Sequence, residues 1–295
     1  MGAFLCACAE TPTGPESAAI SVSESRSVVA GGSKSSEIIY GLLEGNGLIV
    51  FNAGKPNQTS SAVRITGLAA GESVVGIDFR PSDNGLNGVN DIGKLYAVTD
   101  ASRIYIVDPE TGVASSPVAL VLSVGGAPVL LSGSSFGVGF NPAADRLRVH
   151  SNTGQNLRIN VETGVTIVDG PLAYGAADAN AGNNADVTAT GYTNNDANAA
   201  TGTELYAIDV AQDVLVELLA PNTGVLTTVG SLGVNSGLSA GFDISNTTGT
   251  AYAALSTSPS GKSTLYSIDL ETGAATKLGM LAQTKSAVLG IAVKP

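Results

Sequence analysis

The amino-acid sequence predicts an all-β protein, a five-bladed β-propeller closed by pairing of the C-terminal strand with the N-terminal blade. Three observations predict this fold: a glycine motif at nearly constant intervals, a Thr-Gly turn once per interval, and complementary partial repeats at the two ends of the chain. The composition agrees, because 37 of the 295 residues are glycine and only 13% are charged. Such a chain suits many short strands joined by tight turns.

The first element of each repeat is a glycine followed by an apolar residue inside a β-rich run. The five glycines lie at intervals of 63, 52, 50 and 49 residues, and they are Gly76, Gly139, Gly191, Gly241 and Gly290. A second and a third apolar segment follow each of the first four, as at residues 95–98 and 104–107. Short strands that recur with such a period are typical of propeller blades.

Each third segment runs into a turn that ends in Thr-Gly, at residues 108–112, 160–164, 221–224 and 269–273. An Asp or Asn side chain can cap a type I turn, and glycine takes the left-handed position that follows. Such a turn leads into a fourth strand, as at residues 225–229.

The two ends of the chain complete the count of blades. Residues 38–42 and 48–51 resemble second and third strands with no first strand before them, and residues 288–293 resemble a first strand with nothing after it. Pairing them makes a fifth blade and removes the exposed edges of an open array. Two stacked β-sandwiches are the alternative, but they do not explain these complementary ends.

Several of the repeated motifs also carry a family resemblance. Residues 76–81 (GIDFRP), 140–148 (FNPAADRLR), 154–158 (GQNLR), 192–195 (YTNN) and the 221–224 turn resemble the uncharacterised bacterial domain-of-unknown-function family 4394. The resemblance covers roughly residues 38–295. It implies a secreted or surface-attached bacterial protein and transfers no activity.

The N-terminus departs from a complete export signal. The order Leu5-x-Ala7-Cys8 resembles the lipobox of bacterial lipoproteins, in which the cysteine is lipidated. The charged segment and most of the apolar segment of a signal are missing from residues 1–8, as expected if the true start lies upstream. Secretory cleavage near Ala7 or Ala9, or an uninformative start, are the alternatives.

Residues 9–37 are rich in Ser, Ala, Gly and Pro and predict a flexible tether to the propeller domain of residues 38–295. No later stretch approaches the roughly 18 apolar residues of a transmembrane helix. The predicted membrane attachment is therefore by lipid alone. Ala9 is not the Asp that by analogy signals inner-membrane retention, so we expect an outer-membrane or cell-surface lipoprotein, or a secreted protein.

Charge and composition exclude several functions. A net charge of −11 argues against a nucleic-acid partner, because phosphate binding needs a basic surface. Both cysteines, Cys6 and Cys8, lie at the N-terminus, so no disulfide framework or cysteine zinc site is expected in the domain. His150 is the sole histidine, which argues against a Ser-His-Asp or Cys-His catalytic set.

One candidate site is a basic strand face, whose residues are Arg146, Arg148, His150 and, on the following strand, Arg158. Alternate residues of a strand share a face. Internal ion pairs, for instance with Asp145 or Glu162, are one interpretation. The other is a site for a carboxylate or sulfate ligand, which arginine's planar fork recognises well.

A second candidate site is an oxygen-rich stretch made of Asp178, Asn180, Asn183, Asn184, Asp186, Asn194, Asn195 and Asp196. Calcium prefers many oxygen ligands from flexible loops, so calcium is the cofactor this stretch predicts. The alternative is a solvated connection between blades. Asp78 and Asp243 could form a glycosidase pair, but their repetition at equivalent positions indicates a structural role.

Tyr40, Tyr96, Tyr206 and Tyr252 recur at equivalent positions in the predicted second strands. The same argument from repetition assigns them to packing. These observations favour a non-enzymatic extracytoplasmic surface module that binds a glycan or a protein partner or builds extracellular matrix. The alternative is a periplasmic or extracellular hydrolase or lyase, metal-assisted and acting on polysaccharide or lactone.

Overall fold

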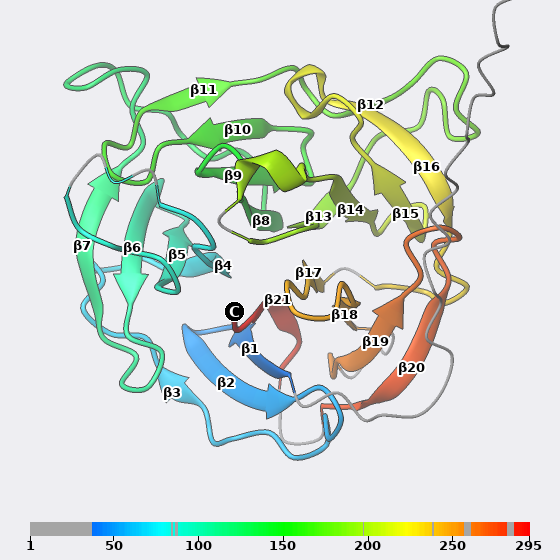
Figure 1. The fold of residues 1–295 in the computed structure, drawn as a ribbon, viewed down its shortest axis with the longest axis horizontal. Coiled ribbons are helices and arrows are strands. Elements are labelled where there is room, and N and C mark those ends of the chain that lie inside the picture. Colours follow the sequence, from blue (N-terminus) through cyan, green and yellow to red (C-terminus); the bar gives the residue numbers. More distant parts are fainter. Residues whose placement is uncertain are drawn as a thin grey trace, which may run out of the picture. The chain divides into compact units, whose positions relative to one another are not determined.

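A computed structural model describes residues 37–295 except 84, 86–87, 197, 238, 257–260 and 282–285. These residues form five small sheets arranged in a ring, so the prediction of a five-bladed β-propeller is confirmed (Figure 1). The two helical segments among the described residues are single 3-10 turns, η1 (Ala199–Thr201) and η2 (Pro221–Thr223). Neither could cross a membrane as a helix.

Each blade is a sheet whose first strand lies nearest the axis of the ring (Figure 1). From the axis outward, the first blade contains β21 (Val288–Val293), β1 (Ile38–Leu43), β2 (Gly47–Asn52) and β3 (Val63–Arg64). The second contains β4 (Val74–Phe79), β5 (Leu95–Thr99), β6 (Arg103–Val107) and β7 (Ala114–Ala119). The third contains β8 (Phe136–Asn141), β9 (Arg146–Ser151), β10 (Asn156–Ile159) and β11 (Thr166–Val168).

The fourth blade has five strands and the fifth blade has four. The fourth contains β13 (Val187–Tyr192), β14 (Leu205–Asp209), β15 (Val214–Glu217), β16 (Val225–Ser231) and β12 (Ala173–Tyr174). The fifth contains β17 (Ala240–Ile244), β18 (Ala251–Leu255), β19 (Thr264–Ile268) and β20 (Ala275–Met280). Strand β12 arrives from the third blade and pairs with β16 in parallel, so it covers an edge that would otherwise be exposed.

The ring is closed by the last strand of the chain. Strand β21 pairs antiparallel with β1, with Ile39 opposite Val293 and Gly41 opposite Ile291. The predicted joining of the two ends is therefore confirmed, and the first blade is completed by strands from both termini of the domain.

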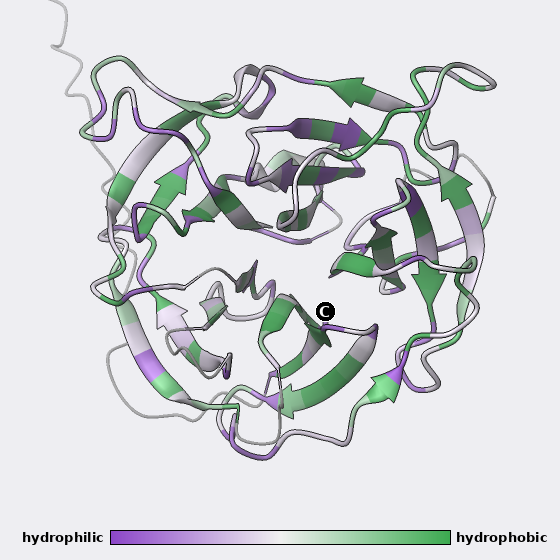
Figure 2. Ribbon diagram, turned by 180° about the vertical axis from the view of Figure 1, so that it is seen from behind, coloured by the Kyte–Doolittle hydropathy of each residue, from purple (hydrophilic) through white to green (hydrophobic). Residues whose placement is uncertain are grey.

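Hydrophobic side chains fill the space between blades, and Figure 2 shows that the strands are more hydrophobic than the loops that join them. The buried residues form five clusters. The recurring glycine allows the inner strands to approach each other. A Cβ atom on Gly241 in β17 would lie 2.7 Å from the carbonyl carbon of Gly290 in β21, which is too close for any larger residue.

Two buried carboxylates tie neighbouring inner strands together. The backbone N–H of Phe140 in β8 donates to Asp78 Oδ2 at 2.6 Å, and the N–H of Val293 in β21 donates to Asp243 Oδ2 at 2.6 Å. Each aspartate thus joins its blade to the next one. This arrangement agrees with the structural role that their repetition indicates.

Candidate ligand-binding site

The connection between the first and second strands of a blade is longest in the second blade. The connection between β4 and β5 comprises residues 80–94, which is 15 residues, whereas four residues join β8 to β9 and six join β17 to β18. Among the connections between first and second strands, the next longest is in the fourth blade, where 12 residues join β13 to β14. The insertion in the second blade accounts for the interval of 63 residues between the first two motif glycines.

Arg80, the first residue of this insertion, lies at the centre of a buried ionic network with a side-chain exposure of 1%. Its Nε and Nη2 atoms donate to the two carboxylate oxygens of Asp145 at 2.8 and 2.6 Å. Nη2 also lies 3.1 Å from Glu162 Oε1 and 3.2 Å from Asp83 Oδ1. Asp145 and Glu162 belong to turns of the third blade, so the network joins the second and third blades.

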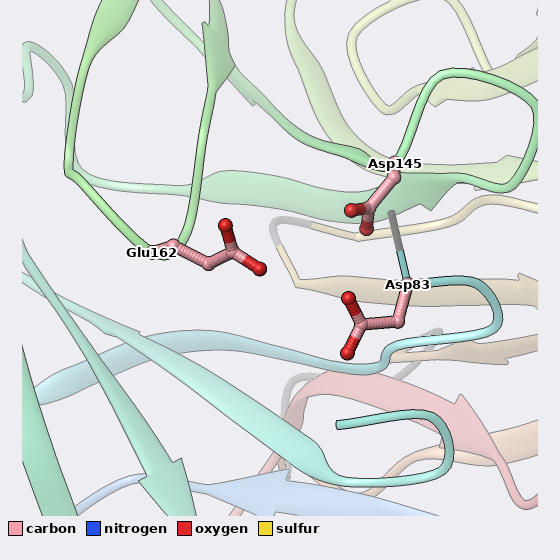
Figure 3. A group of neighbouring side chains, drawn as sticks. All are labelled: Asp83, Asp145 and Glu162. Carbon is pink, nitrogen blue, oxygen red and sulfur yellow. The ribbon is translucent and has the colours of Figure 1, made fainter. Parts of the chain in front are cut away.

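The three carboxylates point toward one another from separate segments of the chain (Figure 3). One oxygen from each of Asp83, Asp145 and Glu162 lies within 4.8 Å of the others, as in a set of metal ligands. Because the Arg80 guanidinium hydrogen-bonds to all three, the network already contains a cation of its own. The arrangement is therefore better described as a buried ion-pair network than as a metal site.

The charge states in the network follow from burial and from the neighbouring charges. Burial alone lowers the pKa of Arg80, but the hydrogen bonds to Asp145 and Glu162 outweigh it and the pKa is raised. Burial would raise the pKa of Asp83. Hydrogen bonds from the N–H groups of Asp91 and Gly85 and the charge of Arg80 outweigh that effect, and the pKa is lowered.

A pocket of about 260 Å³ lies beside this network. Its lining combines aliphatic and polar side chains. The aliphatic residues are Val89, Ile104, Ile106, Val118 and Val161, and the polar residues are Asp91, Lys94, Tyr96, Ser116 and Glu162. The lining thus comes from the insertion, from strands β5 to β7 and from the β10–β11 turn.

The polar side of the pocket is held by internal contacts. Lys94 Nζ lies 2.5 Å from Asp91 Oδ1, and the hydroxyl of Tyr96 donates to Asp91 Oδ2 at 3.2 Å. Burial raises the pKa of Tyr96, so this hydroxyl stays protonated and acts as a donor. A concave site with an apolar wall and a few oriented polar groups is the usual form of a small-ligand site.

The predicted basic strand face lies on β9 and β10, where Figure 2 shows hydrophilic bands. Arg148 is 2% exposed and donates to Asp169, Tyr192, Asn156 and Asn222 at 2.7–3.1 Å. It occupies the second-strand position that tyrosine holds in the other four blades.

Arg158 and Arg148 share Asp169 as their ion-pair partner. The internal partner is therefore Asp169, because Asp145 and Glu162 are bound to Arg80. Arg146 Nη1 donates to the backbone oxygen of Asp145 at 2.7 Å. His150 is fully buried, and burial together with the charge of Arg148 lowers its pKa to about 3. His150 is therefore neutral at physiological pH.

Strand β13 divides the stretch that predicts calcium. Asp178, Asn180, Asn183 and Asp186 precede the strand, and Asp196 follows it, so the two groups lie at opposite ends of a six-residue strand. At about 3.3 Å per residue, this separation prevents Asp196 from sharing an ion with the others. Calcium therefore stays a prediction for residues 178–186.

The polar groups of residues 178–186 have different surroundings. Asp178 Oδ2 and Oδ1 accept hydrogen bonds from the N–H and the hydroxyl of Thr228 at 2.6 and 2.7 Å. Asn180 also donates to the Thr228 hydroxyl, and Asn183 donates to Gln212. Asp186 Oδ1 is buried and has no hydrogen-bond partner among the described residues, so it could bind an ion without breaking a hydrogen bond.

Cys8, the predicted lipidation site, lies outside the described residues.

Sequence reasoning did not select Arg80, Asp83, Asp91 or Lys94 as site residues. The spacing of the repeated glycines was the signal in the sequence that could have indicated this site. The longest interval between motif glycines marks the insertion, and a repeat protein places its variable segments in loops on one face, which is often the binding face.

A family model described as "Domain of unknown function (DUF4394)" matches residues 47–292. No curated protein matches the chain.

Similar solved structures include the hydrazine synthase of Kuenenia stuttgartiensis, with 12% identity, 75% of this chain and 53% of that chain covered, and a TM-score of 0.42. This chain thus spans about half of that one. The glutaminyl cyclase of Myxococcus xanthus has 11% identity, 71% and 77% coverage and a TM-score of 0.44. A protein of unknown function from Bacteroides thetaiotaomicron has 12% identity, 89% and 65% coverage and a TM-score of 0.48.

Proposed function

Because the chain belongs to the DUF4394 family, whose description names no activity, we propose its function from its own residues. It is a non-enzymatic extracytoplasmic surface module that binds a glycan or a protein partner. The observation that carries this proposal is the pocket of about 260 Å³ formed where the insertion of residues 80–94 breaks the propeller repeat.

The chemistry around the pocket supports binding over catalysis. General acid-base catalysis needs a titratable group poised near the working pH and within reach of the substrate. The charged groups at the pocket are instead engaged in short ion pairs, such as Lys94 with Asp91 and Arg80 with Glu162. His150 belongs to the buried basic face and is neutral.

The N-terminal sequence supports placement at the cell surface. In the lipobox-like order, Cys8 is the residue that would carry the lipid. Expressed from its full gene, the protein should incorporate labelled fatty acid, and Cys8→Ser should abolish the incorporation. Label retained by the serine variant would exclude a lipid anchor at Cys8.

Binding is tested with the full chain on a panel of neutral, acidic and amino glycans and on envelope proteins. Val118→Trp places a bulky ring in the wall of the pocket, and Val113→Trp is the matched control on an exposed residue outside the pocket. We expect Val118→Trp to abolish binding and Val113→Trp to preserve it. Equal binding by both variants would show that the pocket is not the site.

A further inference from the structure

The pocket has an aliphatic wall that suits an unbranched hydrocarbon chain. Ile104 and Ile106 from β6, Val118 from β7 and Val161 from the β10–β11 turn all line it, and Ile104 lies opposite Val118 on the neighbouring strand. A sugar ring would bring hydroxyls against these side chains, and a hydroxyl buried without a hydrogen bond is unfavourable. A methylene chain needs no hydrogen bond, and burying it against aliphatic side chains is favourable.

The polar end of the pocket has an excess of negative charge. The adjoining network contains four carboxylates, from Asp83, Asp91, Asp145 and Glu162, and two basic groups, from Arg80 and Lys94. Two negative charges therefore remain in excess. The four carboxylates are largely buried, with side-chain exposures of 4–8%, so solvent screens them weakly. A cation is attracted to this end and an anion is repelled.

The chain itself shows which cation this end of the pocket accepts. The ammonium of Lys94 lies against Asp91, although its side chain is 41% exposed. Lysine is flexible and its ammonium is a compact point charge, so this contact can be exchanged for one with an incoming ammonium group. The guanidinium site, in contrast, is filled by Arg80 and buried.

We propose that the pocket binds a protonated alkylamine, presented as a lysine side chain of a protein partner. The aliphatic stem packs on the wall and the ammonium takes the place of Lys94 beside Asp91 and Glu162. This assignment rests on the proposed binding function, and of the two proposed kinds of partner it selects a protein rather than a glycan.

The test measures binding of two capped amino acids to the full chain by calorimetry or by chemical-shift titration. Nα-acetyl-lysine methylamide carries the ammonium, and Nα-acetyl-norleucine methylamide has the same straight hydrocarbon stem without it. We expect the lysine probe to bind more tightly, by up to about fivefold, and to lose affinity as salt is added. Equal binding of the two probes would overturn the proposal.

Two pairs of variants locate the interaction. Lys94→Met removes the internal competitor and should tighten binding of the lysine probe, whereas Lys277→Met on exposed β20 should not. Glu162→Gln should weaken it several-fold, whereas Glu271→Gln, in the equivalent exposed turn of the fifth blade, should not. If Glu162→Gln does not fold, Lys94→Met still decides, because binding unchanged by that variant contradicts the proposal.

Measurements of oligosaccharide binding distinguish a failure of the alkylamine assignment from a failure of the proposed binding function. If a neutral oligosaccharide binds and Val118→Trp abolishes that binding while the lysine probe fails, the binding function stands and the alkylamine assignment is wrong. If glycans, envelope proteins and the lysine probe all fail to bind, both are wrong. Binding of chitosan oligomers without binding of the lysine probe would move the assignment to an amino sugar.

Discussion

Gly164 ends the turn between β10 and β11 in the third blade. Replacing it with alanine tests the close backbone contact between this turn and the end of β7 in the second blade. Gly164 has a φ of +72°, and a Cβ atom there would lie 2.0 Å from the carbonyl oxygen of Ala119 at the end of β7. Its own carbonyl accepts a hydrogen bond from the N–H of Val121 at 2.9 Å. The missing side chain therefore allows the second and third blades to make backbone contact.

The magnitude follows from two separate effects. A left-handed backbone costs a residue with a Cβ roughly 1–2 kcal/mol, and forcing an atom into a filled space typically costs a further 1–3 kcal/mol. Gly45 isolates the first effect, because it has the same φ of +72° and a Cβ there would meet nothing within 4 Å. Gly164→Ala should therefore destabilise the protein by about 1–3 kcal/mol more than Gly45→Ala.

Urea denaturation followed by circular dichroism measures both variants against the parent protein. The effect of alanine on the unfolded chain is similar at both positions, so it cancels in the comparison. Val161 and Glu162 lie in the same turn and line the pocket, so Gly164→Ala should also weaken binding there. Equal destabilisation by the two variants would refute the assigned role of the close contact.

Four further predictions concern buried charge. Arg80→Met should destabilise the protein by about 3–5 kcal/mol, because it leaves the buried carboxylates of Asp83, Asp145 and Glu162 without their cation. Calcium bound by these three carboxylates should raise the melting temperature of the Arg80→Met variant, whereas in the parent protein Arg80 already occupies that position. Arg148→Met should lower stability in denaturation experiments without altering ligand binding, whereas loss of binding would restore a ligand role to the basic face. Burial raises the pKa of Asp243 to about 7 and that of Asp78 well above its usual value, so stability that is fully present below pH 4 should be lost as the pH rises through 7; Asp243→Asn should reduce this dependence whatever its effect on absolute stability. If residues 178–186 bind calcium, a chelator should lower the melting temperature and calcium should restore it, and Asp178→Asn with Asp186→Asn should erase the difference.

Local repetition made the fold predictable from the sequence. The Thr-Gly turns behave as expected, since Asp108 Oδ1 accepts hydrogen bonds from the N–H groups of Glu110 and Thr111, and Asn160 and Asp269 repeat this pattern in their own turns. Each such signal lies within a few residues of chain. The terminal strands were identifiable because the same local patterns were incomplete there.

The ionic site could not be predicted by the same reasoning. Arg80 is separated from Asp145 by 65 residues and from Glu162 by 82, and no local pattern links them. Sequence proximity was also misleading for Asp186 and Asp196, because an intervening strand carries them to opposite ends of a blade. Long-range pairing depends on which turns the ring places side by side.

The contacts of two buried arginines, Arg80 and Arg148, meet at the third blade. Arg80 joins that blade to the second through Asp145 and Glu162, and Arg148 joins it to the fourth through Tyr192 and Asn222. At the position of Arg148 the other blades use tyrosine. Both arginines are almost completely buried, so the packing of the third blade against its two neighbours depends on buried ion pairs. A partner that binds in the neighbouring pocket therefore changes the charge balance at the interface between the second and third blades. Its binding should stabilise this interface more than the other interfaces between blades.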